Sequence, residues 1–157
     1  VDVAENGDVV LVTNGVYATG GRQASRPDVT SRIVVTNLVL VQSVNGPEVT
    51  AIVGYQVPGT TNGDFAMRCV YLTNGAVLSG FTLTQGATQT SGDAVRQQSG
   101  GGVWCESTRS VVTNCVLTGN AGYYGGGAYS GTLNNCTLTG NSAYLFGGGA
   151  HSSTLSN

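Results

Sequence analysis

The sequence predicts an all-β solenoid, because short segments of the chain repeat and none has the periodicity of a helix. Related hexapeptides begin at Gly100, Gly125 and Gly147, and related heptapeptides begin at Asn114 and Asn135. The spacings of 25, 22 and 21 residues make each unit too short to bury its own apolar face, so neighbouring units must stack. Apolar residues do not recur at i, i+3 and i+4 within a unit, which excludes the helical repeats.

Each unit contains short runs in which apolar and small polar residues alternate, with glycine or asparagine between the runs. This pattern is typical of brief strands joined by tight turns. Runs of β-branched residues at 9–12, 33–35, 38–41 and 50–53 predict earlier and less regular coils. Polar stretches at 56–64 and 87–99 predict two loops that leave the coil. We expect about six coils in a rod on the order of 30 Å long.

Stacking in register should place like residues of successive coils in columns. Four inward columns are expected: Phe81, Cys115 and Cys136; Leu83, Leu117 and Leu138; Leu78, Val112, Leu133 and Leu155; Val70, Val103, Ala128 and Ala150. A further column holds turn residues: Gly80, Asn114, Asn135 and Asn157. A turn of this kind needs a left-handed residue or a stacked side-chain amide, so this column predicts an asparagine ladder.

The composition predicts one domain, residues 1–157, and excludes several functions. Only 9% of the residues are charged, lysine is absent and the net charge is -2. A nucleic-acid partner would require a basic surface, and a membrane surface would require a polybasic or amphipathic patch. No apolar run approaches the roughly 20 residues of a membrane span, so we expect no membrane insertion of this segment. Nothing in the sequence calls for a cofactor.

The cysteines lack the spacing of a metal site, since there is no Cys-x-x-Cys motif and only one histidine. Cys115 and Cys136 fall one coil apart in an inward column, so we expect buried thiols in preference to a disulfide. Cys69 and Cys105 fall on the same wall of neighbouring coils, offset by three residues. A disulfide between them stays open, because export to an oxidising compartment would permit it.

An aromatic column is the strongest candidate for a binding site. If Val103 points inward, strand alternation points Trp104 outward, and the same holds at the matching positions. The expected outward ridge consists of Tyr71, Trp104, Tyr129 and His151. Flat aromatic faces at a fixed repeat can stack on sugar rings or pack against a partner. The alternative is a ladder that stacks on itself and stiffens the sheet.

The repeat motifs Gly-Gly-Gly-Ala-Tyr-Ser and Asn-Cys-Thr-Leu-Thr-Gly-Asn resemble the right-handed parallel β-helix repeats of bacterial surface proteins. They are similar to the repeats of the polymorphic outer-membrane, autotransporter-like adhesins, and residues 7–17 resemble the first coil of pectate-lyase-like β-helices. The resemblance implies a right-handed parallel β-helix at the cell surface or outside the cell. It implies a non-catalytic structural or adhesive rod with a cell-surface or glycan partner.

The same fold also carries polysaccharide lyases and hydrolases, which need clustered carboxylates and a basic residue. Asp93, Arg96 and Glu106 form the alternative catalytic cluster, because they fall in one loop and the adjacent coil. Asp64 and Arg68 are also close in sequence. We favour solvation or surface ion pairs for these groups.

Two further expectations concern the threonines and the ends. Thr82-Leu83-Thr84, Val116-Leu117-Thr118 and Thr137-Leu138-Thr139 resemble the outward arrays of ice-binding solenoids, although ordinary strand propensity also explains them. The first strand lies near the start of the chain, and the repeat stops within a unit at residues 154–157. We therefore expect either an excerpt of a longer solenoid or a protomer that binds its own copies head to tail in a fibre.

Overall fold

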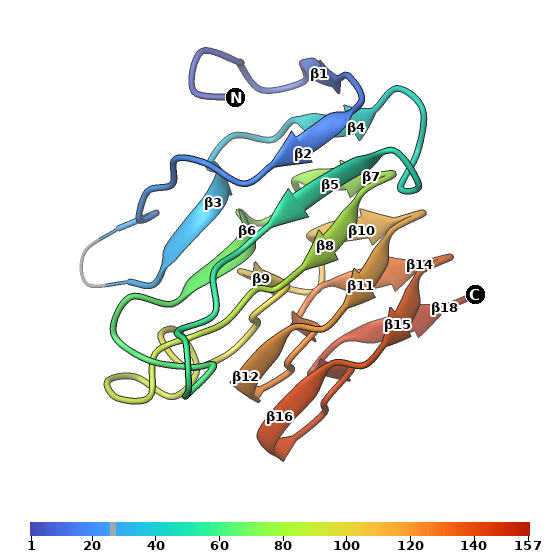
Figure 1. Ribbon diagram of the computed structural model, residues 1–157. Coiled ribbons are helices and arrows are strands. Elements are labelled where there is room, and N and C mark those ends of the chain that lie inside the picture. Colours follow the sequence, from blue (N-terminus) through green and yellow to red (C-terminus); the bar gives the residue numbers. More distant parts are fainter. Residues whose placement is uncertain (26–27) are drawn as a thin grey trace.

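The computed structural model describes residues 1–25 and 28–157, and within them all regular structure is β-strand. Three parallel sheets lie side by side around a narrow core, and the chain visits them in turn (Figure 1). Within each sheet, an inner strand pairs with the strand one turn earlier and with the strand one turn later, and the two outermost strands have one neighbour each. The protein is therefore a parallel β-helix, as the repeats predict.

The strands of each sheet follow one another along the helix axis. The first sheet contains β1 (Val9–Val12), β4 (Leu40–Ser43), β7 (Val77–Ser79), β10 (Val111–Thr113), β14 (Thr132–Asn134) and β18 (Thr154–Ser156). The second contains β2 (Gly15–Tyr17), β5 (Thr50–Val53), β8 (Thr82–Thr84), β11 (Val116–Thr118) and β15 (Thr137–Thr139). The third contains β3 (Thr30–Val35), β6 (Met67–Leu72), β9 (Val103–Cys105), β13 (Ala128–Tyr129) and β17 (Ala150–His151).

The strand register confirms the predicted columns. Leu117 pairs with Leu83 on one side and Leu138 on the other, and both Leu83 and Leu117 are fully buried. The Leu78 and Val70 columns are equally in register, and Phe81 with the two cysteines packs beside them in the same core. Side chains of similar shape thus stack at the interstrand distance, about 4.8 Å, which fills the core evenly.

Asparagines stabilise the turns of the repeat. Asn114 and Asn135 have φ values of 52° and 48°, and the amide of Asn135 donates to Oδ1 of Asn114 at 2.7 Å. A second ladder, which the sequence does not predict, lies inside the coil. There Asn120 is buried and its Nδ2 donates to the Oδ1 of Asn141 at 3.0 Å and to the carbonyl of Leu83 at 2.9 Å. These bonds pair buried amides that would otherwise destabilise the core.

The glycine triplets of the repeat mark a point where successive coils approach closely. A Cβ atom on Gly101 would collide with the backbone carbonyl of Ala121 in the next coil, and one on Gly126 would collide with that of Ser142. Only glycine fits at such positions, so the triplets recur for a steric reason.

The last two coils contain an extra pair of strands that the sequence does not predict. β12 (Ala121–Tyr124) and β16 (Ser142–Phe146) are parallel, and their register shifts between Gly122 and Tyr124. In the two preceding turns, loops of residues 54–66 and 85–102 occupy the position of this extra strand. They contain the loops predicted at 56–64 and 87–99. Both loops extend from the same side of the β-helix, next to β12 (Figure 1).

All four cysteines are free and buried. This confirms the expectation for Cys115 and Cys136, and Cys69 and Cys105 form no disulfide. The sulfur of Cys69 lies 3.2 Å from the carbonyl oxygen of Thr84, in a corner of the core. Burial raises the pKa of the Cys69, Cys105 and Cys115 thiols to about 12, so they stay protonated at neutral pH.

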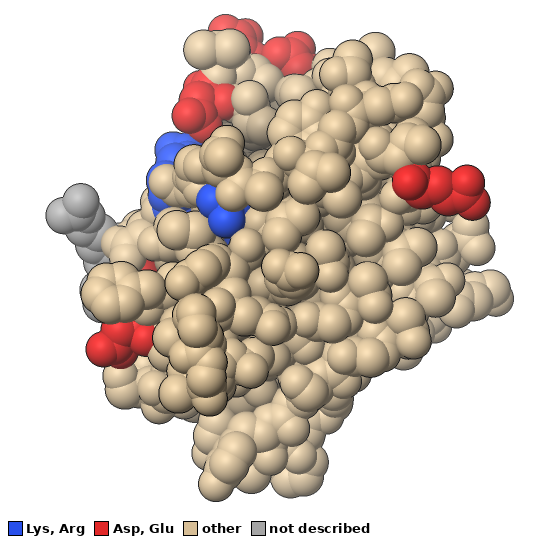
Figure 2. Space-filling view, in the orientation of Figure 1, with Lys and Arg blue, Asp and Glu red and all other residues tan. Residues whose placement is uncertain are grey.

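The surface carries little charge. On the face that presents the second sheet, few Lys, Arg, Asp or Glu side chains are visible, and most of them lie toward its margins (Figure 2). In the described part of the chain, no helix combines the length and apolar character needed to cross a membrane.

Candidate functional site

The four residues of the predicted ridge form a continuous aromatic stack on the outer side of the third sheet. Tyr71 and Trp104 have ring centroids 5.3 Å apart, Trp104 and Tyr129 are 6.4 Å apart, and Tyr129 and His151 are 5.7 Å apart. The interplanar angles are 15°, 7° and 12°. Strand register alone produces this arrangement, because the four residues are direct partners in β6, β9, β13 and β17.

The stack differs from the expected ridge in its exposure. Tyr71 and Trp104 are only 3% and 8% exposed, whereas Tyr129 and His151 are half-buried. The cover comes from the loop of residues 85–102 and from the segment that precedes β3. The indole of Trp104 donates to the carbonyl of Val95 in that loop at 2.9 Å. Tyr71 and Trp104 are therefore not available as an open contact surface in this structure.

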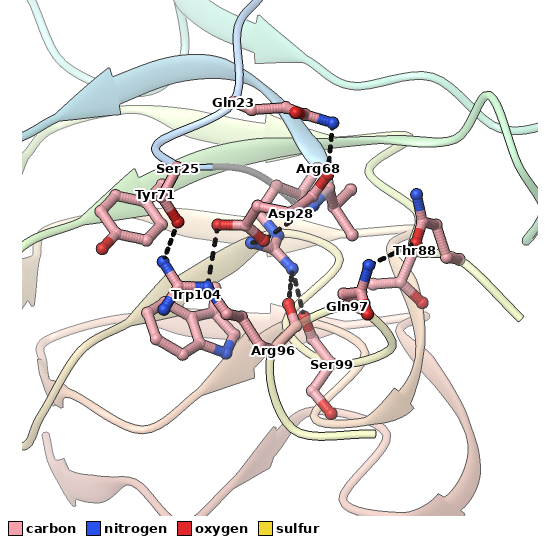
Figure 3. A network of polar contacts seen from close by, with 12 residues as sticks. Gln23, Ser25, Asp28, Arg68, Tyr71, Thr88, Arg96, Gln97, Ser99 and Trp104 are labelled. Carbon is pink, nitrogen blue, oxygen red and sulfur yellow. Dashed lines mark hydrogen bonds and ion pairs between the residues drawn. The ribbon is translucent and has the colours of Figure 1, made fainter. Parts of the chain in front are cut away.

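A group of charged residues, the polar cluster of Asp28, Arg68 and Arg96, holds this cover in place; Asp28 and Arg68 are buried, and the side chain of Arg96 is 39% exposed (Figure 3). Nη1 of Arg68 lies 3.3 Å from Oδ1 of Asp28, and both side chains are fully buried. Nε of Arg96 lies 3.4 Å from the other carboxylate oxygen. The side chains come from the segment before β3, from β6 and from the second loop, so the cluster ties three parts of the chain together.

Arg68 also binds backbone carbonyl groups of the second loop, residues 85–102. Its Nη2 donates to the carbonyl of Arg96 at 2.6 Å and to that of Ser99 at 3.2 Å. Both guanidinium groups lie over the ring of Trp104, at 5.8 Å for Arg68 and 5.7 Å for Arg96. Burial lowers the pKa of Arg68 to about 10, with Asp28 opposing the change, so Arg68 stays charged at neutral pH. The polar cluster therefore holds the second loop against the aromatic stack.

The sequence did not predict this cluster. It placed Arg68 near Asp64, whereas the structure pairs Arg68 with Asp28, forty residues earlier in the chain. Asp28 lies outside the regular repeats, so no column relates it to Arg68. The alternation of β6 adds no signal either, because Cys69 and Val70 both enter the core.

The side chains of the alternative catalytic residues do not converge, and the one contact among them is between Asp93 and the backbone of Arg96. Oδ1 of Asp93 accepts a hydrogen bond from the backbone nitrogen of Arg96 at 2.6 Å, which closes a turn of the loop. Arg96 itself pairs with Asp28 and donates to Ser25 at 2.7 Å. Among the described residues, no ion pair joins Arg96 to Asp93 or Glu106.

Glu106 caps the turn that follows β6. Its carboxylate accepts hydrogen bonds from the hydroxyl of Tyr71, from the Thr73 hydroxyl at 2.8 Å and from the Asn74 backbone nitrogen at 2.9 Å. Burial opposes ionisation of this carboxyl, but these hydrogen bonds outweigh it and lower the pKa of Glu106. Burial, together with the hydrogen bond to Glu106, raises the pKa of Tyr71. Glu106 is thus an ionised acceptor that orients Tyr71.

A second set of aromatic residues, which the sequence reasoning missed, lies on β12 and β16. Tyr124 stacks on Phe146 at 6.2 Å, and the same tyrosine lies 5.0 Å from His151. Together with Tyr129 they extend the open end of the aromatic stack. We call the four residues Tyr124, Tyr129, Phe146 and His151 the open aromatic patch. The repeat does contain a sequence signal for this second set, because aromatic residues follow both of its Gly-Asn pairs, at 119–120 and at 140–141.

The threonines of the second sheet also form columns. Thr84, Thr118 and Thr139 are direct partners, whereas Val116 interrupts the parallel column between Thr82 and Thr137. The hydroxyl of Thr82 donates to the carbonyl of Pro47 at 2.8 Å, so this residue is already engaged.

Three parallel sheets, in-register columns and asparagine ladders define the protein as a parallel β-solenoid. Comparisons with protein-family models, with curated proteins and with solved structures gave no match. Within the described ranges, no three His, Cys, Asp or Glu side chains are grouped to hold a metal ion.

Proposed function

We propose that the chain is a non-catalytic structural or adhesive β-solenoid that acts outside the cell or on a bacterial surface. Its contacts are made through the open aromatic patch. The motif resemblance to polymorphic outer-membrane, autotransporter-like proteins and to pectate-lyase-like β-helices supports the extracellular assignment. The proposal depends on one observation above all: aromatic side chains of successive coils are stacked in register and exposed on the outer side of the β-helix.

Two features of the patch favour binding. Phe146 is 62% exposed although it is a large apolar side chain, and Tyr124, Tyr129 and His151 are partly open beside it. Exposed aromatic groups of this kind mark contact surfaces, because their burial against a partner releases much apolar area. The sheet fixes their spacing, so little conformational entropy is lost when a partner binds.

The test is adhesion of the purified chain to immobilised polysaccharides and mucin. We expect saturable binding that Phe146→Ala weakens about tenfold, the loss expected for one anchor of a small aromatic surface. Phe65→Ala is the matched control, because Phe65 is 79% exposed but lies outside the patch. Equal binding by wild type and Phe146→Ala would remove the patch from the proposal.

The runner-up function is a polysaccharide lyase or hydrolase that uses Asp93, Arg96 and Glu106. Assays over mixed acidic polysaccharides would reveal turnover, and Asp93→Asn and Glu106→Gln should then abolish it. Turnover with this dependence would replace the non-catalytic proposal.

Ice binding is a further candidate, supported by the column of Thr84, Thr118 and Thr139 on a face with few charges (Figure 2). A thermal-hysteresis measurement tests it, and absence of hysteresis at high concentration would eliminate it. Head-to-tail stacking into a fibre is tested by light scattering, since particle length should rise with protein concentration. A mass that stays monomeric would contradict the fibre.

A further inference from the structure

A pocket of about 340 Å³ lies between the two loops and the extra strands β12 and β16. One side consists of hydroxyl and amide side chains from the loops: Thr60, Asn62, Gln89, Thr90 and Gln98. The other side consists of Tyr123 and Tyr144, whose rings stack at 5.4 Å and 20°. The volume lies within the range of about 300–1,000 Å³ that is usual for small-molecule sites.

The amide groups of the pocket are held in place and each offers one free polar end. Oδ1 of Asn62 accepts from the Thr88 backbone nitrogen at 3.1 Å, so its Nδ2 is left to donate. Oε1 of Gln89 accepts from Gln97 at 3.2 Å, so its Nε2 is also left to donate. Nε2 of Gln98 donates to Gly92 at 2.8 Å, which leaves its Oε1 as an acceptor. None of the three free atoms has a hydrogen-bond partner among the described residues.

The walls of the pocket are connected to one another and to the coil. The backbone nitrogen of Gly63 donates to the carbonyl of Thr88 at 3.0 Å, which joins the two loops. The Thr88 hydroxyl and the Tyr123 backbone nitrogen both donate to the carbonyl of Gln98, at 3.0 and 2.5 Å. The second loop is therefore bonded to both the first loop and β12, so the pocket is formed in advance of binding.

The chemistry of the lining selects the ligand. The lining contains no Asp, Glu, Lys, Arg or His, so a charged ligand would lose hydration without gaining a counter-charge. A wholly apolar ligand would leave the amide and hydroxyl groups unpaired. A ligand that has many hydroxyl groups and also a flat apolar face satisfies both requirements. A sugar ring without charged substituents has this combination.

We infer that the pocket is a binding site for a neutral oligosaccharide, with Tyr144 as the aromatic platform and Gln89 as a principal donor. This inference deepens the adhesive role and rests on the proposed function for its biological meaning. The pocket adjoins the open aromatic patch, because the rings of Tyr123 and Tyr124 meet edge to face with centroids 4.9 Å apart, but Phe146 and Tyr124 do not line it.

The test is calorimetric titration with maltotriose, cellotriose, xylotriose and N-acetylated chitotriose, with trigalacturonate as the charged comparison. We expect at least one neutral trisaccharide to bind with a Kd below about 10 mM and trigalacturonate not to bind. Tyr144→Ala should weaken binding about tenfold, Gln89→Leu should also weaken it, and Tyr144→Phe should restore it by keeping the ring.

Leu145→Ala is the matched control, because it removes an exposed apolar side chain from the same strand, next to Tyr144, but not from the pocket. It should leave trisaccharide affinity unchanged. The inference is overturned if no neutral trisaccharide binds at about 10 mM, or if Tyr144→Ala binds as tightly as wild type. Circular dichroism of each variant checks that the fold is retained.

The two proposals fail in different ways. If adhesion depends on Phe146 but no trisaccharide binds, only the pocket is wrong. If trisaccharide binding depends on Tyr144 but the immobilised surfaces are not bound, the adhesive function is wrong and the pocket remains.

Discussion

The carboxylate of Asp28 and the guanidinium of Arg68 form an ion pair in which both side chains are completely buried, with Oδ1 and Nη1 3.3 Å apart. Asp28 lies in the segment before β3 and Arg68 lies on β6, the strand that pairs with β3, and their contact closes the cover over Tyr71 and Trp104. A buried pair of this kind adds little net stability, but loss of one partner leaves an uncompensated charge.

Asp28→Asn should therefore lower the free energy of unfolding by about 3–5 kcal/mol, measured by urea denaturation. Asp2→Asn is the control, because Asp2 pairs with Arg22 at 2.7 Å while 68% exposed. Its effect should stay below about 1 kcal/mol. An equal decrease in the free energy of unfolding in the two variants would show that the buried pair does not hold the loop in place.

Leu117→Ala removes a fully buried side chain from the column between Leu83 and Leu138. We expect a loss of about 2–5 kcal/mol in the free energy of unfolding, because the cavity cannot collapse between two fixed coils. Leu11→Ala, at a position that is 64% exposed, should change it by no more than about 0.5 kcal/mol. A small effect at Leu117 would contradict the stacked core.

The cysteines should be unreactive in the folded protein. Burial raises the pKa of Cys69 from its ordinary value of 9.0 to about 12, so almost no thiolate is present at pH 8. Iodoacetamide should label none of the four thiols in native protein and all four in denaturant, as mass spectrometry can show. Rapid labelling of native protein would contradict their burial.

The same thiols predict a loss of stability at high pH. Between the unfolded and folded pKa values, 9.0 and about 12 for Cys69, the unfolded chain releases a proton that the folded chain keeps. The free energy of unfolding should therefore fall as the pH rises above about 9, and Cys69→Ala should reduce that slope. Urea denaturation at pH 8, 9 and 10 measures it.

Glu106 predicts the opposite dependence at low pH. Its pKa is lower in the folded protein than in the unfolded chain, so its contribution is present above the unfolded value of 4.5. It is lost as the pH falls through the lower folded value. The difference in unfolding free energy between wild type and Glu106→Gln should shrink on acidification. A difference that stays constant with pH would mean that the carboxylate is not held by Tyr71 and Asn74.

The sequence by itself determined the solenoid, the core columns and the register of the aromatic stack. It could do so because each coil repeats the one before, and parallel pairing places equal positions of the repeat over one another. The ladder at Asn114 and the column at Leu117 follow from this periodicity alone. The extra strands β12 and β16 were missed because two coils are too few to reveal their period.

Only the tertiary structure decided which parts of the stack are open. Tyr71 and Trp104 share their column with Tyr129, yet they are covered because Arg68 meets Asp28, forty residues earlier in the chain and outside the columns of the repeat. The loop pocket beside Tyr144 likewise depends on two irregular segments that meet in space. Contacts of this kind have no period in the sequence, so they arise only when the chain is folded.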